Sequence, residues 1–431
     1  MPISIFKKLL TNSFWSVLAS TSNRGVALIL SILAARLLTE SDFSSFSIIQ
    51  NTLTTLYTLA SLGVSVAGAK FISESLNISF YNIIKIQNIL LKVTYISASG
   101  FIVFLLILKN EIAQYIFHSL DSGVYVYFLS ALLFINVLIG TQTGILSGLK
   151  EFKSQAKVQF FIGFLNLLLQ AISIYFFGFF ELLFAWVFGN SLVLLANHYV
   201  IRSSISKHKL IKSLYPPAPP PIDKKLIIRF MLATAGTSII VIPAHTIVLA
   251  WLNNGINHIE IGWFQTGVLW MQLVAFVPTS IANVFITSLS PLLAEKKFVE
   301  VKETAFKSIK AVVGLSLLIS FLAAFLSPFI ISVYGSKFNG FSSIFYISLA
   351  CGFVLSINTI LGSVMLSAGL ASKALITNFV WSLFYISLSF IFLQEGFGVF
   401  YVFLSCLIAY LIHFLLIIFY IYSHFSKIKI I

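Results

Sequence analysis

The stretch of residues 13–35, SFWSVLASTSNRGVALILSILAA, carries a single charge, Arg24, near its middle. The stretch is long enough to cross a bilayer, which takes about 20 apolar residues in a helix. A guanidinium stays charged at that depth, and even lenient insertion scales assign it a cost of roughly 2.5–3.5 kcal/mol. We therefore expect Arg24 to face a polar cavity inside a helix bundle, where its fixed charge favours an anionic ligand such as a carboxylate or a phosphate. The alternative is that Arg24 binds backbone carbonyls and locks the first helix.

The rest of the chain has the composition of a polytopic membrane protein. Hydrophobic residues make up 59% of the 431 positions and charged residues 9%, and the mean hydropathy is +1.01, so a soluble fold would lack polar side chains for its surface. We expect an all-α integral membrane fold, with transmembrane helices in two six-helix lobes around a central cavity. Runs of about 20 apolar residues predict twelve spans, at residues 13–35, 43–69, 89–108, 123–149, 158–177, 182–201, 230–252, 261–289, 308–333, 341–368, 374–393 and 398–422.

The charged residues predict how the chain is oriented. All 27 basic residues except Arg24, Arg36, Lys109 and Lys337 fall on the termini or on alternate connections between the predicted spans. The positive-inside rule then places both termini in the cytoplasm, and it explains the net charge of +14 without nucleic acid. The 13 acidic residues all lie at or near predicted interfaces, so the chain lacks the deep carboxylate that a cation-coupled drug exporter usually needs.

Two short similarities relate the two halves of the chain. The start of the second span, residues 42–46 (DFSSF), is similar to the start of the eighth, residues 260–264 (EIGWF). The end of the fourth span, residues 144–156, is similar to the end of the tenth, residues 366–374, and both similarities run in the same orientation. These matches predict a parallel repeat about an axis along the membrane normal.

A basic stretch with five prolines within residues 216–221 separates the halves and favours a stiff, extended linker. We expect an N-lobe at residues 1–202, a cytoplasmic linker at residues 203–228 and a C-lobe at residues 229–431.

The sequence contains no motif that indicates catalysis. It shows no metal-ligand spacing, no nucleophile motif and no phosphate-binding loop, so we expect a transporter, with no cofactor and no metal site. Coupling to H⁺ or Na⁺ is left open. Cys351 and Cys406 lie in apolar runs and are expected to be core residues.

Several of these residues carry a resemblance to a known family. Residues 12–15 (NSFW), 23–25 (NRG), 34–38 (AARLL) and 42–47 (DFSSFS) resemble the opening of the Wzx-type O-antigen flippases, in the polysaccharide-transporter branch of the multidrug/oligosaccharidyl-lipid/polysaccharide (MOP) exporter superfamily. Residues 144–156 are similar to the end of that family's fourth helix. Ser44 stands where such sequences often have glycine, which affects backbone packing and not the cargo site.

The resemblance implies a MATE-like fold in the bacterial inner membrane and a role in lipopolysaccharide biosynthesis. The protein would flip an undecaprenyl-pyrophosphate-linked oligosaccharide across the lipid bilayer by alternating access, with a polysaccharide polymerase and a chain-length regulator as partner proteins. Three alternatives stay open: a lipid II flippase, a MATE-like drug or cation antiporter and, with less support, a membrane glycosyltransferase or polymerase.

Five residues are candidates for substrate binding. Arg24 and His245 are the deepest ionisable residues, and we expect Arg24 to offset the pyrophosphate charge and His245 to add a titratable contact. Arg36, Asn23 and Gln272 complete the set. The alternatives are an interfacial anchor for Arg36, a packing residue for His245, and interhelical hydrogen bonding for the amides Asn23, Gln50, Asn51, Asn136, Gln142, Asn166, Gln170, Gln272, Asn283 and Asn358.

Overall fold

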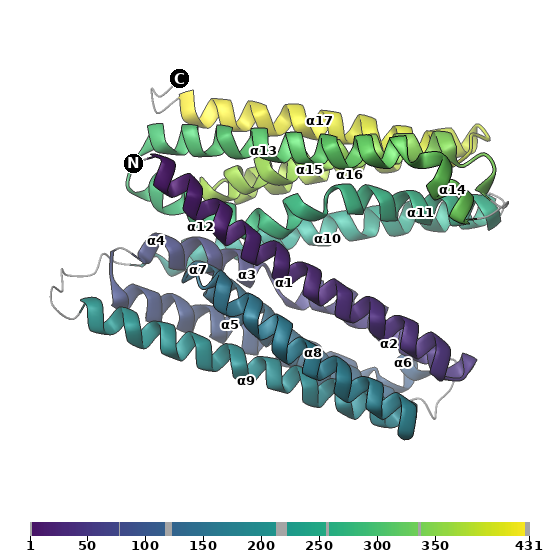
Figure 1. Ribbon diagram of the computed structural model, residues 1–431, viewed down its shortest axis with the longest axis horizontal. Helices are drawn as coiled ribbons and strands as arrows, with labels where there is room; N and C mark the ends of the chain where they lie inside the picture. The colour runs from purple at the N-terminus through teal and green to yellow at the C-terminus, as the bar shows by residue number, and fades with distance from the viewer. Residues whose placement is uncertain are drawn as a thin grey trace. The chain divides into compact units, whose positions relative to one another are not determined.

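The computed structural model describes residues 2–76, 78–116, 123–212, 222–255, 258–334 and 338–426, and within these ranges the regular elements are all helices (Figure 1). The helices of the first half are α1 (Pro2–Leu37), α2 (Glu40–Ala60), α3 (Val64–Ala67), the π-helix η1 (Gly68–Ile72), α4 (Ser73–Ser75), α5 (Phe80–Ile107), α6 (Lys109–Ile116), α7 (Gly123–Gly148), α8 (Phe152–Phe176) and α9 (Phe179–Lys212). Those of the second half are α10 (Lys224–Gly255), α11 (His258–Val274), α12 (Phe276–Ala294), α13 (Phe298–Phe325), α14 (Ser327–Tyr334), α15 (Ser342–Ser367), α16 (Ala371–Gln394) and α17 (Val399–Ser426).

Each predicted span coincides with one helix or with consecutive helices. Three predicted spans are divided: the second into α2, α3 and the start of η1, the eighth into α11 and α12, and the ninth into α13 and α14. Within the described ranges, nine helices are long and apolar enough to cross a membrane, or ten if the bent segment at residues 48–75 counts as one span. Helices α5 and α9 extend beyond their apolar runs because the backbone stays hydrogen-bonded after the side chains become polar.

The chain divides into two compact units. The N-unit comprises residues 8–235, and the C-unit comprises residues 1–7 and 236–431. Helix α10 therefore contributes its first turns to the N-unit and its remainder to the C-unit. The lobe boundaries at residues 202 and 229 stay a prediction, and residues 213–221 of the expected linker lie outside the described ranges.

The two units use the same packing scheme on corresponding helices. In the N-unit, α7 packs against α2, α5 and α9, and α8 packs along α9. In the C-unit, α15 packs against α11, α12, α13 and α17, and α16 packs along α17. The short helices α6 and α14 follow α5 and α13 in the same positions. This order agrees with the parallel repeat predicted from the sequence.

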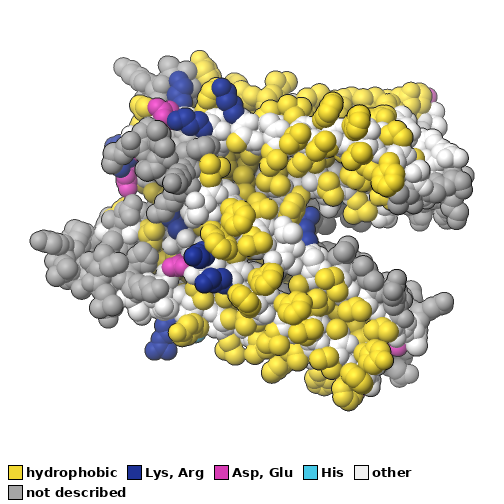
Figure 2. Space-filling model, in the orientation of Figure 1, with side chains coloured by type: hydrophobic (Ala, Val, Ile, Leu, Met, Phe, Trp, Pro, Cys, Tyr) yellow, Lys and Arg dark blue, Asp and Glu magenta, His cyan; other side chains and the backbone are white. Residues whose placement is uncertain are grey.

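Large apolar side chains cover the outer surfaces of both units. Phe161 and Phe164 on α8 and Phe321 and Phe325 on α13 are among many that are exposed, and Figure 2 shows hydrophobic side chains over much of the visible face of each unit. Soluble proteins rarely expose apolar patches of this extent. The surface is therefore suited to contact lipid.

Backbone-to-backbone contact holds the bent second span against α7. Gly140, Gly144 and Gly148 repeat every four residues along α7 and so lie on one face. A Cβ at Gly144 would overlap the backbone of Ser65, and one at Gly148 would lie 2.5 Å from the carbonyl oxygen of Gly68. Small residues at this spacing allow two helix backbones to approach closely in a membrane.

We predict that Gly144→Ala lowers stability by about 1–3 kcal/mol, because the added methyl must push α7 away from α3. Thermal unfolding of the purified protein in detergent measures the change. Gly163→Ala on α8 is the matched control, since a Cβ there meets no atom within 4 Å, and its unfolding temperature should stay the same or rise. Equal unfolding temperatures for the two variants would contradict this account.

The ends of α7 and α15 share one turn but differ in the residue that makes it. Glu151 N donates to Leu146 O, and Leu370 N donates to Met365 O, each at 2.9 Å. Both bonds need a left-handed residue in the turn, which is Lys150 (φ 62°) after α7 and Gly369 (φ 78°) after α15. Lysine has a Cβ that disfavours this conformation, so the first turn is strained and the second is not.

Lys150→Gly should therefore raise stability by about 0.5–1 kcal/mol, because removing the strain outweighs the greater freedom of glycine in the unfolded chain. Gly369→Ala should lower stability by a similar amount. Thermal unfolding measures both shifts. A destabilised Lys150→Gly variant would show that the lysine side chain stabilises the fold by more than its left-handed backbone conformation destabilises it.

Candidate substrate-binding residues

Helix α1 holds three of the five candidate residues. Ala19, Leu30 and Ala34 form its buried stripe, and Leu30 and Ala34 belong to the core of the N-unit. Arg24 lies off this stripe and is exposed, so its guanidinium is not enclosed by protein. The structure thus leaves Arg24 accessible, while its placement in a polar cavity stays a prediction.

Asn23 and Arg36 differ in what the structure shows of them. Asn23 is exposed, and it makes no hydrogen bond with any residue in the described ranges. Arg36 lies in the last turn of α1, but its side chain is outside the described part of the structure. Both therefore stay candidates from the sequence.

His245 lies in the C-unit beside a stack of buried aromatic rings. Its ring centroid is 5.7 Å from that of Trp381 and 5.3 Å from that of Tyr385, both on α16. Trp381 in turn stacks on Tyr385 at 5.6 Å and on Tyr410 of α17 at 5.2 Å. Trp381 and Tyr385 are each 1% exposed, so α10 presents His245 to the interior of the C-unit.

Two buried polar atoms of this aromatic cluster are without a hydrogen-bond partner in the described part of the chain. Nδ1 of His245 and Nε1 of Trp381 are buried without a hydrogen-bond partner among the described residues. Buried polar groups nearly always have a partner, either protein or water. The cluster can therefore accept a water molecule or a polar ligand group. The sequence did not reveal Trp381, since it is one of many aromatic residues in apolar runs.

Gln272 is not part of this cluster. It lies on α11 with an exposed side chain, and it makes no hydrogen bond with any described residue. Its neighbour Met271, together with Phe264 and Val274 of α11, enters the C-unit core. Arg24 and Asn23 belong to the N-unit, and His245 and Gln272 belong to the C-unit.

Several other intramembrane amides join helices or bond to their own helix. Asn166 on α8 donates to Asn190 Oδ1 on α9 at 3.0 Å, and Gln170 donates to Asn166 Oδ1 at 2.6 Å. Asn358 donates to the carbonyl of Tyr410 at 3.0 Å. Asn136 donates to the carbonyl of Leu132 one turn before it. For Asn166 and Asn358 the interhelical interpretation is confirmed, whereas Gln170 and Asn136 bond within their own helices.

The sequence missed a buried ion pair beside the π-helix. Lys70 falls on a predicted cytoplasmic connection, yet its side chain is buried and its Nζ lies 2.6 Å from Glu74 Oε1. The ammonium also lies 5.6 Å from the ring centroid of Phe71 and 5.9 Å from that of Phe230 on α10. Only the spacing of Lys70 and Glu74, four residues apart, could have suggested this pair.

Neither a metal site nor a disulfide is found in the described part of the chain. No group of three or more His, Cys, Asp or Glu residues there is placed to hold a metal ion. Cys351 and Cys406 are buried free thiols, and Cys351 Sγ lies 3.4 Å from the carbonyl oxygen of Phe403. Their predicted role as core residues is confirmed.

A family model described as "Polysaccharide biosynthesis protein" matches residues 9–235, which is more than half of the chain. The chain belongs to this polysaccharide biosynthesis family. The matched region contains Arg24, Asn23 and the Lys70–Glu74 pair, whereas His245 and Gln272 lie beyond it. No curated protein matches the chain.

Solved structures show the fold of this chain. An outward-facing multidrug resistance MATE family transporter of the MOP superfamily matches with a TM-score of 0.81 at 14% identity, over 99% of this chain and 97% of that one. A MOP superfamily transporter from Pyrococcus furiosus Vc1 (DSM3638), described as having a binding pocket of reverse polarity, matches with a TM-score of 0.82 at 14% identity over the same shares. A MATE protein in a straight conformation matches with a TM-score of 0.77 at 16% identity, over 98% and 97%.

These comparisons confirm two expectations for the chain. It has the all-helical, two-lobe fold seen in MOP transporters, and it is a multi-pass membrane protein. At these identities the solved structures show the fold alone.

The Lys70–Glu74 pair gives a test within the matched region. Glu74→Gln should destabilise the protein by about 3 kcal/mol, because it removes the negative charge that lies 2.6 Å from the buried Lys70 ammonium. The matched control is Glu303→Gln, which removes the acid of an exposed pair with Lys307 at the same four-residue spacing and should cost less than about 0.5 kcal/mol. Thermal unfolding compares the two variants, and equal effects would show that the pair contributes no more than a surface ion pair.

Proposed function

We propose that this protein translocates an undecaprenyl-pyrophosphate-linked oligosaccharide, such as an O-antigen repeat unit, from the cytoplasmic to the outer leaflet of the bacterial inner membrane. The observation that carries the proposal is the match of residues 9–235 to the polysaccharide biosynthesis family, on a fold shared with MOP transporters. The sugar chain and the pyrophosphate cannot enter hydrocarbon without a large desolvation cost. A transporter that alternates between two openings removes that cost, and the polyprenyl tail stays in lipid.

Arg24 supplies the positive charge that the pyrophosphate requires. Arginine forms bidentate, charge-assisted hydrogen bonds with phosphate oxygens, and it stays protonated at any working pH. The exposed side chain of Arg24, near the middle of α1, supports this role. His245 is proposed as a second contact through its unpartnered Nδ1. Asn23, Gln272 and Arg36 are proposed to contact sugar hydroxyls or the headgroup.

A MATE-like drug or cation antiporter is the second candidate, because a multidrug MATE transporter shares the fold. The absence of a carboxylate from the middle of any predicted span counts against a cationic cargo. A lipid II flippase would use the same physical mechanism, and the family match favours a surface polysaccharide over it. Coupling to H⁺ or Na⁺ and the polymerase and chain-length regulator partners stay proposals from the resemblance.

The proposal is tested in proteoliposomes that carry a lipid-linked oligosaccharide, with its arrival at the outer surface measured by a membrane-impermeant glycosidase. Arg24→Ala should slow translocation by roughly 10- to 100-fold, the equivalent of losing a charged hydrogen bond of about 1.5–3 kcal/mol. Arg24→Lys should retain part of the activity, since lysine keeps the charge but not the bidentate geometry. The control is Arg202→Ala, which removes an exposed arginine of α9 just beyond the predicted apolar run 182–201, and this variant should transport normally.

Two results would overturn these proposals. Full translocation by Arg24→Ala at normal abundance would remove Arg24 from the mechanism. Failure of the unmodified protein to move the oligosaccharide, together with cation-driven efflux of a cationic dye, would replace the flippase with the antiporter.

A further inference from the structure

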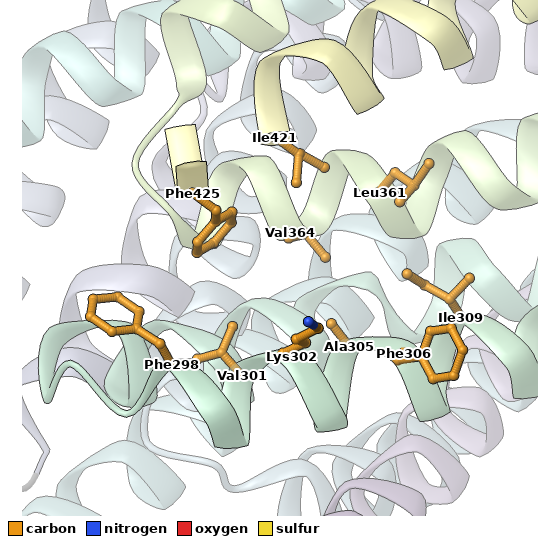
Figure 3. Close-up of a pocket in the computed structure, with 10 residues that line it drawn as sticks. All are labelled: Phe298, Val301, Lys302, Ala305, Phe306, Ile309, Leu361, Val364, Ile421 and Phe425. Atoms are coloured by element: carbon orange, nitrogen blue, oxygen red, sulfur yellow. The ribbon is translucent and has the colours of Figure 1, made fainter. Parts of the chain in front are cut away.

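A groove on the C-unit lies between α13 and α17, with α15 as its floor. Its volume is about 280 Å³ (Figure 3). One wall is a stripe of α13 at helical spacing, including Phe298, Lys302, Phe306 and Ile309, and the other wall is Ile421 and Phe425 of α17. Leu361 and Val364 of α15 are buried beneath them. Both α13 and α17 pack against α15, so the groove is a feature of one compact unit.

Among the described residues that line this groove, Lys302 alone is charged. The other lining residues are aliphatic or aromatic, and Figure 3 shows the Lys302 nitrogen among their carbon atoms. Lys302 is exposed and forms no ion pair with any acid in the described ranges. Two neighbouring lysines form ion pairs: Lys297 Nζ lies 2.6 Å from Glu295 Oε2, and Lys307 Nζ lies 3.3 Å from Glu303 Oε2. The groove therefore offers apolar walls and one ammonium that no acid of the described ranges neutralises.

The groove also extends across the predicted edge of the hydrocarbon. Lys302 precedes the apolar run that begins at residue 308, whereas Ile309 and Leu361 lie within apolar runs. An occupant must therefore be anionic at one end and apolar along its length. A volume near the lower end of the roughly 300–1,000 Å³ typical of ligand pockets holds part of one chain and not a whole lipid.

We propose that this groove is a binding site for an anionic glycerophospholipid, with a segment of one acyl chain between α13 and α17 and the phosphate accepting a hydrogen bond from Lys302 Nζ. Phospholipids surround a membrane helix with their apolar acyl chains, and an ammonium at the interface favours those phospholipids whose headgroups are anionic. Lys373, 5.2 Å from the ring centroid of Tyr420 beside Ile421, adds positive charge near this end of α17. The groove lies outside residues 9–235, so the proposal does not depend on the transported cargo.

The test uses the full-length protein in nanodiscs with two photoreactive lipids, a phosphatidylglycerol and a phosphatidylcholine with identical diazirine-bearing acyl chains. Adducts mapped by mass spectrometry should fall on residues 298–309 and 421–425, with about fivefold more from the phosphatidylglycerol, as expected from about 1 kcal/mol per interfacial lysine. Lys302→Glu should abolish this preference and Lys302→Arg should keep it. Lys307→Glu, on the same helix but outside the groove, is the matched control and should also keep it.

Ala305→Trp should fill the groove and remove adducts from both lipids, and the Lys302 variants carry the test if that variant misfolds. Equal labelling by the two lipids, or an unchanged preference in Lys302→Glu, would mean that ordinary annular lipid contacts the groove without headgroup recognition. Stronger competition by undecaprenyl phosphate than by phosphatidylglycerol at equal mole fraction would overturn the proposed occupant in favour of a polyprenyl lipid.

Discussion

Contact between two helix backbones, along the glycine face of α7, is the constraint on which the N-unit depends. Gly144 and Gly148 leave no room for a side chain between α7 and the bent second span. In a membrane, helices gain little from hydrophobic association, so close packing and hydrogen bonds must hold them together. The π-helix η1 fits this arrangement, because its extra residue shifts the face that the second span turns toward α7. Lys70 and Glu74 lie directly beside this contact, and their ion pair keeps two charges within a closely packed region.

The C-unit achieves the same architecture with different chemistry. Its central helix α15 contributes Phe345 and Cys351 to the core, and Gly352 of the same helix closely approaches the backbone of Met271 on α11. Stacked aromatic rings on α16 and α17 fill the space beside His245. The two halves therefore share helix order and packing partners, while one has an ion pair and the other an aromatic cluster with unpartnered polar atoms. This difference agrees with a family match that covers the first half only.

The sequence predicted the helices well and the side-chain contacts poorly, for physical reasons. Hydropathy reports which residues prefer lipid, so the twelve spans were placed, but it does not report where backbone hydrogen bonding stops, so α5 and α9 proved longer than predicted. The positive-inside rule assigned Lys70 to a cytoplasmic connection with the other basic residues, because the distribution of charge along the sequence cannot show that the rings of Phe71 and Phe230 lie beside its ammonium. Asn166 could have met a sugar or another helix, and only the fold showed Asn190 of α9 within reach. Trp381 gave no signal at all, since its neighbours come from helices distant in sequence.

The buried thiols have a practical consequence for studying this protein in motion. The chain has two cysteines, and both Cys351 and Cys406 are enclosed by the core of the C-unit, where a water-borne maleimide or methanethiosulfonate reagent has little access. A cysteine introduced on an exposed position would therefore react against a low background. Spin labels or fluorophores can be attached to pairs of such positions with the native sequence otherwise intact, and distances between them can be followed through a transport cycle.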